Sequence, residues 1–131
     1  ILTAVRIARA DYEGYGGHYI KYGKREAMEI ATMGCAVCVK LTADKGHVED
    51  LRIAFGVANP IPMRCHGTEE KVKGMAVDAA LLDAVSQGVL TEVHPRDSWR
   101  ASKAFRLQLI REMSRRALAQ AITYAGGEIH A

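Results

Sequence analysis

Pro60 and Pro62, near the middle of the chain, separate two halves that have different hydrophobic periods. Proline has no backbone N–H to give a central strand, so this segment fits a crossover from sheet to helix. β-forming residues dominate before the prolines, and apolar residues recur at helical spacing after them. Strands followed by helices predict an α+β fold, in which one antiparallel sheet is covered by a small helical layer. Because strands and helices do not alternate, a Rossmann-type domain is not expected.

The first half predicts an antiparallel meander of about three strands. The chain is extended from Tyr19 onward, residues 30–41 are rich in β-forming side chains, and residues 42–46 have the composition of a hairpin connection. Residues 48–55 return along the hairpin with a second apolar set. These segments account for the sheet of the predicted fold.

The returning strand does not keep a single phase. Val48 is an odd number of residues away from both Leu51 and Ile53, and successive side chains of a strand point to opposite faces. One extra residue on this strand restores the phase and puts all three apolar side chains on one face. We therefore expect a β-bulge near Glu49 and Asp50.

The beginning of the chain is strand-like and has no initiator Met. In residues 1–10, the apolar side chains of Ile1, Val5 and Ile7 fall on one face of an extended segment. We expect this segment to be a leading strand or the tail of a preceding domain in a longer chain. Residues 1–131 are then one domain, cut from that longer chain at or near a domain border.

The second half predicts three helices, at residues 64–74, 77–93 and 97–127. Asp97 or Ser98 is the expected cap of the third and longest helix, and glycines stop it. The expected apolar stripe of that helix consists of residues four apart, namely Phe105, Leu109, Met113, Ala117 and Ala121.

Composition limits the setting of the protein. The formal net charge is +3, which permits a basic patch and does not require an anionic partner. No apolar run approaches the roughly 20 residues of a membrane span, and no signal peptide is apparent. The three cysteines are an odd number and outline no disulfide framework, so a reducing cytoplasm is expected.

The cysteines offer little chemistry. Cys35 and Cys38 form a Cys-x-x-Cys motif within a predicted strand, where residues three apart point to opposite faces. Their sulfurs therefore do not meet readily, and a structural role is expected. Cys65 has only His66 as a nearby potential ligand, so a zinc site is not expected.

Other catalytic and binding patterns are also weak. The five histidines are scattered, and no nucleophile–base pair or pair of catalytic acids is apparent. Residues 14–17, Gly-Tyr-Gly-Gly, lack the Lys-Ser/Thr pair of a phosphate-binding loop. The arginines of the last helix point in different directions around its axis, which favours solvated or ion-paired roles over a nucleic-acid interface. We expect no catalytic residue in this chain.

Tyr19 and Lys21 are the most informative pair. Two residues apart on an extended segment, they face the same way. One interpretation is an exposed edge strand on which Lys21 opposes aggregation. The other is a site for a planar, partly anionic ligand, which a tyrosine ring can contact on its face and an ammonium group at its edge. The residues alone leave both interpretations open.

Three segments carry a family resemblance: "YIKYGKREAMEIATMGCAVCV", "LRIAFGVANPIPMRC" and "SWRASKAFRLQLIREMSRRAL". In this order and spacing they resemble the C-terminal domain of the FAD-binding subunit of molybdenum hydroxylases. Xanthine dehydrogenases are the most similar, and carbon monoxide dehydrogenase flavoproteins are more distant. The resemblance implies a three- to four-stranded antiparallel sheet followed by a three-helix layer.

The resemblance also implies a role in a larger cytoplasmic oxidoreductase. Such enzymes hydroxylate a purine at a molybdenum cofactor on a large subunit. Electrons then pass through [2Fe-2S] clusters on a small subunit to FAD, and NAD⁺ collects them. The glycine-rich segments that hold the FAD pyrophosphate belong to an earlier domain, so the isolated fragment is expected to be inactive and to bind FAD weakly.

Carried over by resemblance, Tyr19 matches a position near the flavin ring, and Lys21 matches a lysine at its edge that favours negative charge. Arg25 lies in a loop that borders the flavin, and Glu29 replaces a shorter acid found in many relatives. Structural roles in capping, core packing and local salt bridges are implied for Arg100, Ser102, Phe105 and Arg106. A non-redox protein–protein interaction module is the alternative function, and a nucleic-acid binder is a weaker one.

Overall fold

The computed structural model describes residues 1–130 and contains one sheet and one helical layer. The sheet is antiparallel with strand order β1-β2-β3-β4. Its strands are β1 (Gly16–Tyr22), β2 (Met33–Leu41), β3 (Val48–Gly56) and β4 (Met63–Arg64). The helices are α1 (His66–Lys71), α2 (Ala79–Gly88) and α3 (Lys103–Tyr124), with short 3₁₀ turns η1 (Arg9–Asp11) and η2 (Val89–Thr91). The predicted α+β architecture is confirmed.

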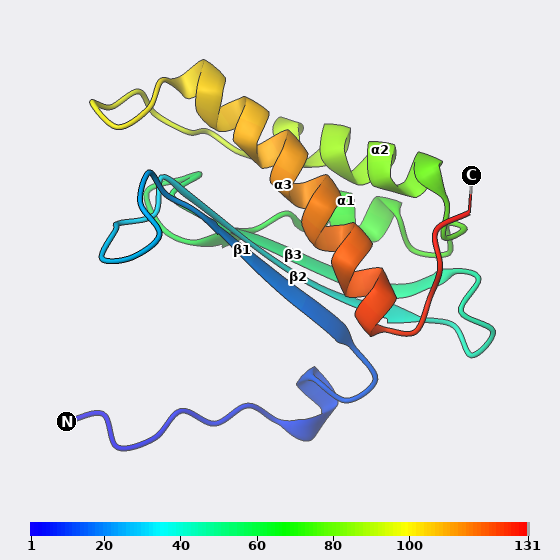
Figure 1. Ribbon diagram of the computed structural model, residues 1–131. Coiled ribbons are helices and arrows are strands. Elements are labelled where there is room, and N and C mark those ends of the chain that lie inside the picture. Colours follow the sequence, from blue (N-terminus) through cyan, green and yellow to red (C-terminus); the bar gives the residue numbers. More distant parts are fainter. Residues whose placement is uncertain (131) are drawn as a thin grey trace.

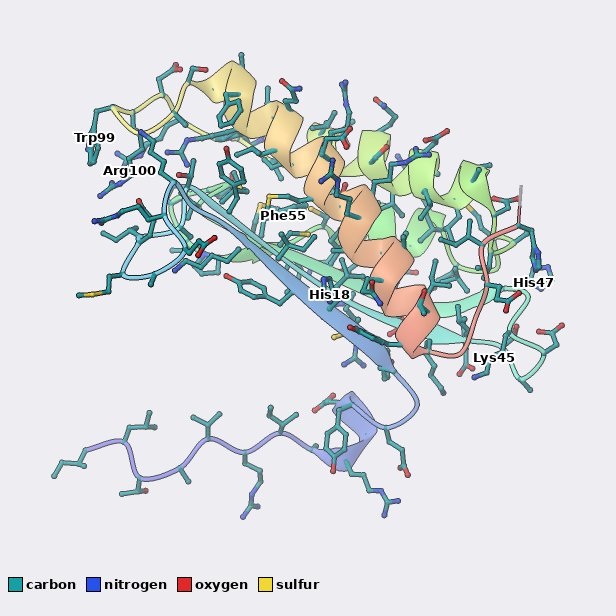
Figure 2. The ribbon with its side chains drawn as sticks, viewed as in Figure 1. His18, Lys45, His47, Phe55, Trp99 and Arg100 are labelled. Atoms are coloured by element: carbon teal, nitrogen blue, oxygen red, sulfur yellow. The ribbon has the colours of Figure 1, made fainter. Side chains whose placement is uncertain are left out.

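All three helices cover the same face of the sheet (Figure 1). Alternate residues of β2 and β3 point into the layer between sheet and helices, where Phe55 lies (Figure 2). The largest fully buried side chains there include Met33, Leu51, Ile53, Leu81, Ile110, Leu118 and Ile122. Each such side chain contributes about 1.5–3 kcal/mol through removal from water, which makes this layer the main source of stability.

The opposite face of the sheet, hereafter the open face, is covered by none of α1, α2 and α3 (Figure 1). The N-terminal segment runs on this side and contacts one end of the face. There the Arg52 guanidinium lies 4.5 Å from the centroid of the Tyr15 ring and donates a hydrogen bond to the Asp11 carbonyl at 3.0 Å. The open face is therefore the surface on which exposed side chains of β1 are displayed.

The expected leading strand is wrong. Residues 1–8 belong to no helix or strand, and the side chains of Ile1, Val5 and Ile7 are exposed. An extended segment forms a strand only when a neighbour pairs with its backbone, and β1 pairs with β2 alone. The other expectation, that residues 1–10 are the tail of a preceding domain, stays a prediction.

The β-bulge is confirmed. Lys40 pairs with Asp50 and Leu41 pairs with Val48, so Glu49 is the extra residue on β3. The bulge brings Val48 onto the buried face, as the apolar pattern requires. Glu49 points outward and forms an ion pair with Lys40 at 2.5 Å.

The expectations for the last helix need two corrections. Ser102 is the N-cap of α3 and accepts a hydrogen bond from the Phe105 N–H at 3.2 Å. Asp97 and Ser98 lie before the helix, but the Asp97 carboxylate accepts from the first N–H of the helix, that of Lys103, at 2.6 Å. The expected stripe is buried only at Met113, Ala117 and Ala121, and Phe105 is 39% exposed. Four residues advance about 400° around the helix axis, which is more than one full turn. Residues spaced by four therefore lie progressively farther around the helix, away from the buried face. The buried face also includes Arg106, Ile110, Ser114, Leu118 and Ile122.

The helix arginines do not gather on one face. Arg115 pairs with Asp83 on α2, and Arg116 pairs with Glu112 at 3.6 Å, as expected for ion-paired residues. Arg106 is the exception, because it is buried rather than solvated and has no salt bridge among the described residues. None of the helices in residues 1–130 has the length and apolar character needed to cross a membrane.

The Cys-x-x-Cys prediction holds: Cys35 is buried under the helices, and Cys38, three residues on, is half-buried on the open face. Burial raises the pKa of the Cys35 and Cys65 thiols to about 12.

We therefore expect iodoacetamide at pH 8 to modify Cys38 at least about a thousandfold faster than Cys35 or Cys65, because only the thiolate reacts. Mass spectrometry of timed samples measures this ratio. Equal rates in folded protein would contradict the assignment, and equal rates in urea are the control.

Candidate functional site

Tyr19 and Lys21 both project from β1 onto the open face, as the period of the strand predicts. Ile20, between them, and Tyr22, after them, turn the other way: Ile20 packs against the core, and the centroid of the Tyr22 ring lies 5.9 Å from that of the Phe105 ring of α3. Tyr19 is 60% exposed, and Lys21 is also exposed. An aromatic ring and an ammonium group therefore stand side by side on the uncovered side of the sheet.

The surface next to this pair is flat because its residues are small. Four neighbouring positions on β2 and β3 form what we call the small-residue floor: Gly34, Ala36, Ala54 and Gly56. Tyr19 is opposite Ala36 in the sheet, and Lys21 is opposite Gly34. The Tyr19 ring leans over Gly34, where an added Cβ would lie 2.8 Å from the Tyr19 hydroxyl oxygen. Glycine at this position thus lets the ring lie close to the sheet.

The loop after β1, residues 23–32, folds around Glu29. Lys21 Nζ donates to the Glu29 carbonyl oxygen at 2.6 Å, and Arg25 Nε donates to the Glu29 carboxylate at 3.0 Å. Arg25 also donates to the Met28 carbonyl at 3.0 Å. Gly23 permits this fold, because a Cβ there would lie 2.8 Å from Glu29 Cγ. The loop therefore ties Lys21 and Arg25 to one residue.

The two cations differ in electrostatic setting. The Glu29 carboxylate lies beside Arg25 and neutralises its charge, whereas Lys21 bonds only a neutral carbonyl. Within residues 1–130, Lys21 has no salt bridge. The positive charge of Lys21 remains available to a ligand, and the Tyr19 ring supplies an adjacent apolar face.

The structure thus brings Tyr19, Lys21 and Arg25 to one end of β1 and adds Glu29, for which the sequence alone predicts no defined role. The signal for Glu29 was its spacing of four from Arg25, which is also the spacing of an ordinary surface ion pair. Met28, next to it, is 95% exposed and has a positive φ of 50°, an uncommon conformation for this residue.

A cavity away from Tyr19 and Lys21 offers no acid–base pair in its described lining. A surface cavity of about 540 Å³ lies beside the β3–β4 loop, lined by residues 57–62 with His94 and Arg96. Its lining has no carboxylate and no cysteine to pair with His94. Residues 1–130 also contain no group of three His, Cys, Asp or Glu side chains placed to hold a metal ion.

Fold and site together define a small α+β domain with helices on one sheet face and an aromatic–ammonium pair on the other. The family model for the CO dehydrogenase flavoprotein C-terminal domain matches residues 18–121. The chain therefore belongs to this family.

Individual relatives agree with that assignment. The chain is 42% identical over 129 residues to the xanthine dehydrogenase FAD-binding subunit of Escherichia coli O157:H7, covering 98% of this chain and 44% of the relative. It thus spans less than half the length of this curated relative. It is 24% identical over 117 residues to the glyceraldehyde dehydrogenase medium chain of Sulfolobus acidocaldarius, covering 89% of this chain and 40% of that one.

A solved structure matches as well. Carbon monoxide dehydrogenase from Hydrogenophaga pseudoflava superposes with a TM-score of 0.77 at 27% identity, covering 86% of this chain and 38% of the matched chain. Quinoline 2-oxidoreductase from Pseudomonas putida 86 gives the same TM-score at 18% identity over 85% of this chain and 38% of that one, which supports the fold alone.

Proposed function

We propose that this chain is the C-terminal domain of the FAD-binding subunit of a xanthine dehydrogenase-like molybdenum hydroxylase, and that its open face lies against the flavin. The observation that carries the proposal is the placement of Tyr19 and Lys21 on one uncovered face beside the small-residue floor. These residues fit a flavin for two reasons. The small-residue floor leaves room for a planar ring, and the ammonium group of Lys21, which has no salt bridge within residues 1–130, can interact with the edge of that ring. The 42% identical relative is a FAD-binding subunit, which supports the same reading.

Each residue has a distinct role in this proposal. When bound, the flavin supplies the electron-transfer chemistry, and the protein tunes it through the groups that touch its ring. Tyr19 contacts the ring, and the Lys21 ammonium stabilises negative charge at its edge. Arg25 acts by fixing the Glu29 carboxylate, and the Glu29 carbonyl orients the Lys21 side chain.

The setting is part of the same proposal. The domain works in a complex whose large subunit carries a molybdenum cofactor and whose small subunit carries [2Fe-2S] clusters, with a purine as reductant and NAD⁺ as acceptor. The matched carbon monoxide dehydrogenase from Hydrogenophaga pseudoflava is a molybdenum-cofactor enzyme in a form that lacks the Mo-pyranopterin moiety, which supports this setting. Three unpaired cysteines fit a cytoplasmic enzyme.

Lys21→Met in the intact enzyme tests the proposal. Without the ammonium group, negative charge on the flavin is less stable, so the midpoint potential should fall by about 30 mV or more, which is about 1.4 kcal/mol for two electrons. Spectroelectrochemical titration measures this potential. A lower flavin potential weakens electron transfer from the [2Fe-2S] clusters to the flavin, so NAD⁺ reduction should slow in stopped-flow traces, while purine hydroxylation with artificial acceptors persists.

Lys45→Met is the matched control. Lys45 lies on the β2–β3 hairpin, at the end of the domain away from Trp99 and Arg100 (Figure 2), and its loss also removes one positive charge. The potential should not change in this variant. Equal potentials for the Lys21→Met and wild-type enzymes would overturn the proposed flavin contact.

A further inference from the structure

Arg106, in the first turn of α3, is a buried cation without an anionic partner. The residue is 2% exposed, and no carboxylate within residues 1–130 forms a salt bridge with it. Burial and the nearby Arg96 and Arg100 lower its pKa, and Asp97 opposes them only in part. A guanidinium in such a place is unfavourable unless its hydrogen bonds offset the loss of water.

The hydrogen bonds of Arg106 join two separate loops. Nη1 donates to the Thr32 carbonyl oxygen at 2.6 Å, and Nη2 donates to the Ser98 hydroxyl at 2.9 Å. Nε has no partner among the described residues. Thr32 ends the 23–32 loop, and Ser98 lies in the segment between η2 and α3. Arg106 therefore bridges positions that are far apart in the sequence.

The Thr32 end of the bridge controls the base of the loop that holds Lys21. Thr32 is itself buried, and its N–H donates to the Tyr22 carbonyl at 2.8 Å, which closes the loop above the last β1–β2 pair. From the α3 side, the Arg106 guanidinium donates a hydrogen bond to the Thr32 carbonyl oxygen. Both backbone groups of Thr32 are thus fixed, one from β1 and one from α3.

A second, surface contact joins the same two segments. Lys24 Nζ lies 5.8 Å from the centroid of the Trp99 ring, and the Arg100 guanidinium lies 4.4 Å from it. Trp99 is 81% exposed, and both labelled residues project from the loop before α3 (Figure 2). Cation–π contacts at exposed sites are weak, so the buried Arg106 bridge is the stronger of the two links.

We propose that Arg106 is a positioning residue: by holding Thr32 it fixes the 23–32 loop so that the Glu29 carbonyl keeps Lys21 directed at its ligand. The effect on a flavin rests on the function proposed above, whereas the effect on the loop does not. Arg106 acts through the backbone of another residue and touches no ligand itself.

Arg106→Met in the intact flavin-loaded enzyme tests the proposal, because methionine fills similar space without a donor. Amide hydrogen exchange, read by mass spectrometry, should speed up at least about tenfold at Thr32, whose N–H is the one amide of residues 23–32 with a described acceptor, and stay unchanged in β2 and β3. Arg111→Met, which removes an exposed arginine from the same helix, is the control and should change neither segment. Trp99→Ala should have a smaller effect on the loop than Arg106→Met.

Arg106→Lys covers the case in which the methionine variant does not fold. Lysine keeps the charge but has one nitrogen for two acceptors, so loop exchange should again rise while β2 and β3 stay protected. Unchanged loop exchange in a folded Arg106 variant would overturn the proposal.

Flavin measurements separate this proposal from the proposed function. The midpoint potential should shift in Arg106→Met in the same direction as in Lys21→Met. Suppose that Lys21→Met shifts the midpoint potential, and that Arg106→Met speeds exchange in the loop but leaves the midpoint potential unchanged. The positioning role of Arg106 is then wrong. If neither variant shifts the potential, the flavin contact fails while the exchange result still decides whether Arg106 fixes the loop.

Discussion

Gly16→Ala is expected to destabilise the domain by about 3 kcal/mol or more, because the added methyl group overlaps backbone atoms. An added Cβ at Gly16 would lie closer than 3 Å to the Ala121 carbonyl oxygen and to backbone atoms of Ala125. These backbone atoms belong to the last turn of α3 and to the residue that follows it, so no side-chain rotation can relieve the overlap. The helix must move away from β1, and urea denaturation followed by circular dichroism measures the loss.

Gly17→Ala is the matched control for that prediction. The neighbouring Cβ would meet Cys38 Sγ at 3.5 Å and the Val37 carbonyl oxygen at 3.8 Å, which are ordinary contacts. Alanine is also less flexible than glycine in the unfolded chain, so this variant should be neutral or slightly stabilised. Similar losses at both positions would mean that β1 and α3 do not pack as closely as described.

Glu69→Ala is expected to cost about 1–3 kcal/mol, because it leaves the buried Ile53 N–H without an acceptor and removes the partner of the partly exposed Arg64. The Glu69 side chain is 3% exposed and receives two hydrogen bonds from Arg64, at 3.0 and 2.7 Å. It also accepts from the Ile53 backbone N–H at 2.9 Å and contacts His66 Nδ1 at 3.0 Å. The carboxylate thus joins α1 to β3 and β4, and urea denaturation again measures its contribution.

Glu70→Ala is the control for Glu69→Ala. Glu70 is the next residue on α1 but is exposed and pairs only with Lys73 at 2.6 Å among the described side chains. Exposed ion pairs of this kind contribute about 0–1 kcal/mol. A Glu69→Ala variant as stable as Glu70→Ala would contradict the anchoring role of the buried carboxylate.

Local periodicity was sufficient to predict much of this molecule. The alternation along β1 put Tyr19 and Lys21 on one side, and the broken phase at Val48 located the bulge at Glu49. These predictions depend only on the geometry of a strand and on which residues are apolar. The helices after Pro62 were predicted in the same way, from apolar residues at helical spacing.

The errors came from features that depend on partners distant in the sequence. Residues 1–8 have the composition of a strand, but no neighbouring strand pairs with them. Arg106 looked like a surface arginine because its acceptors, Thr32 and Ser98, are brought to it only by the packing of α3 on the sheet. Glu29 is a similar case, since its contact with Lys21 depends on how the loop closes.

The central claim is that Tyr19 and Lys21, on the open face, lie against the flavin of the intact enzyme. A crystal structure of that enzyme with FAD bound tests it directly through the distance from Lys21 Nζ to the nearest flavin atom. We predict hydrogen-bond distance, about 3 Å, with the Tyr19 ring in contact with the ring system. A flavin that lies beyond the helical face, with both side chains in solvent, would contradict the account.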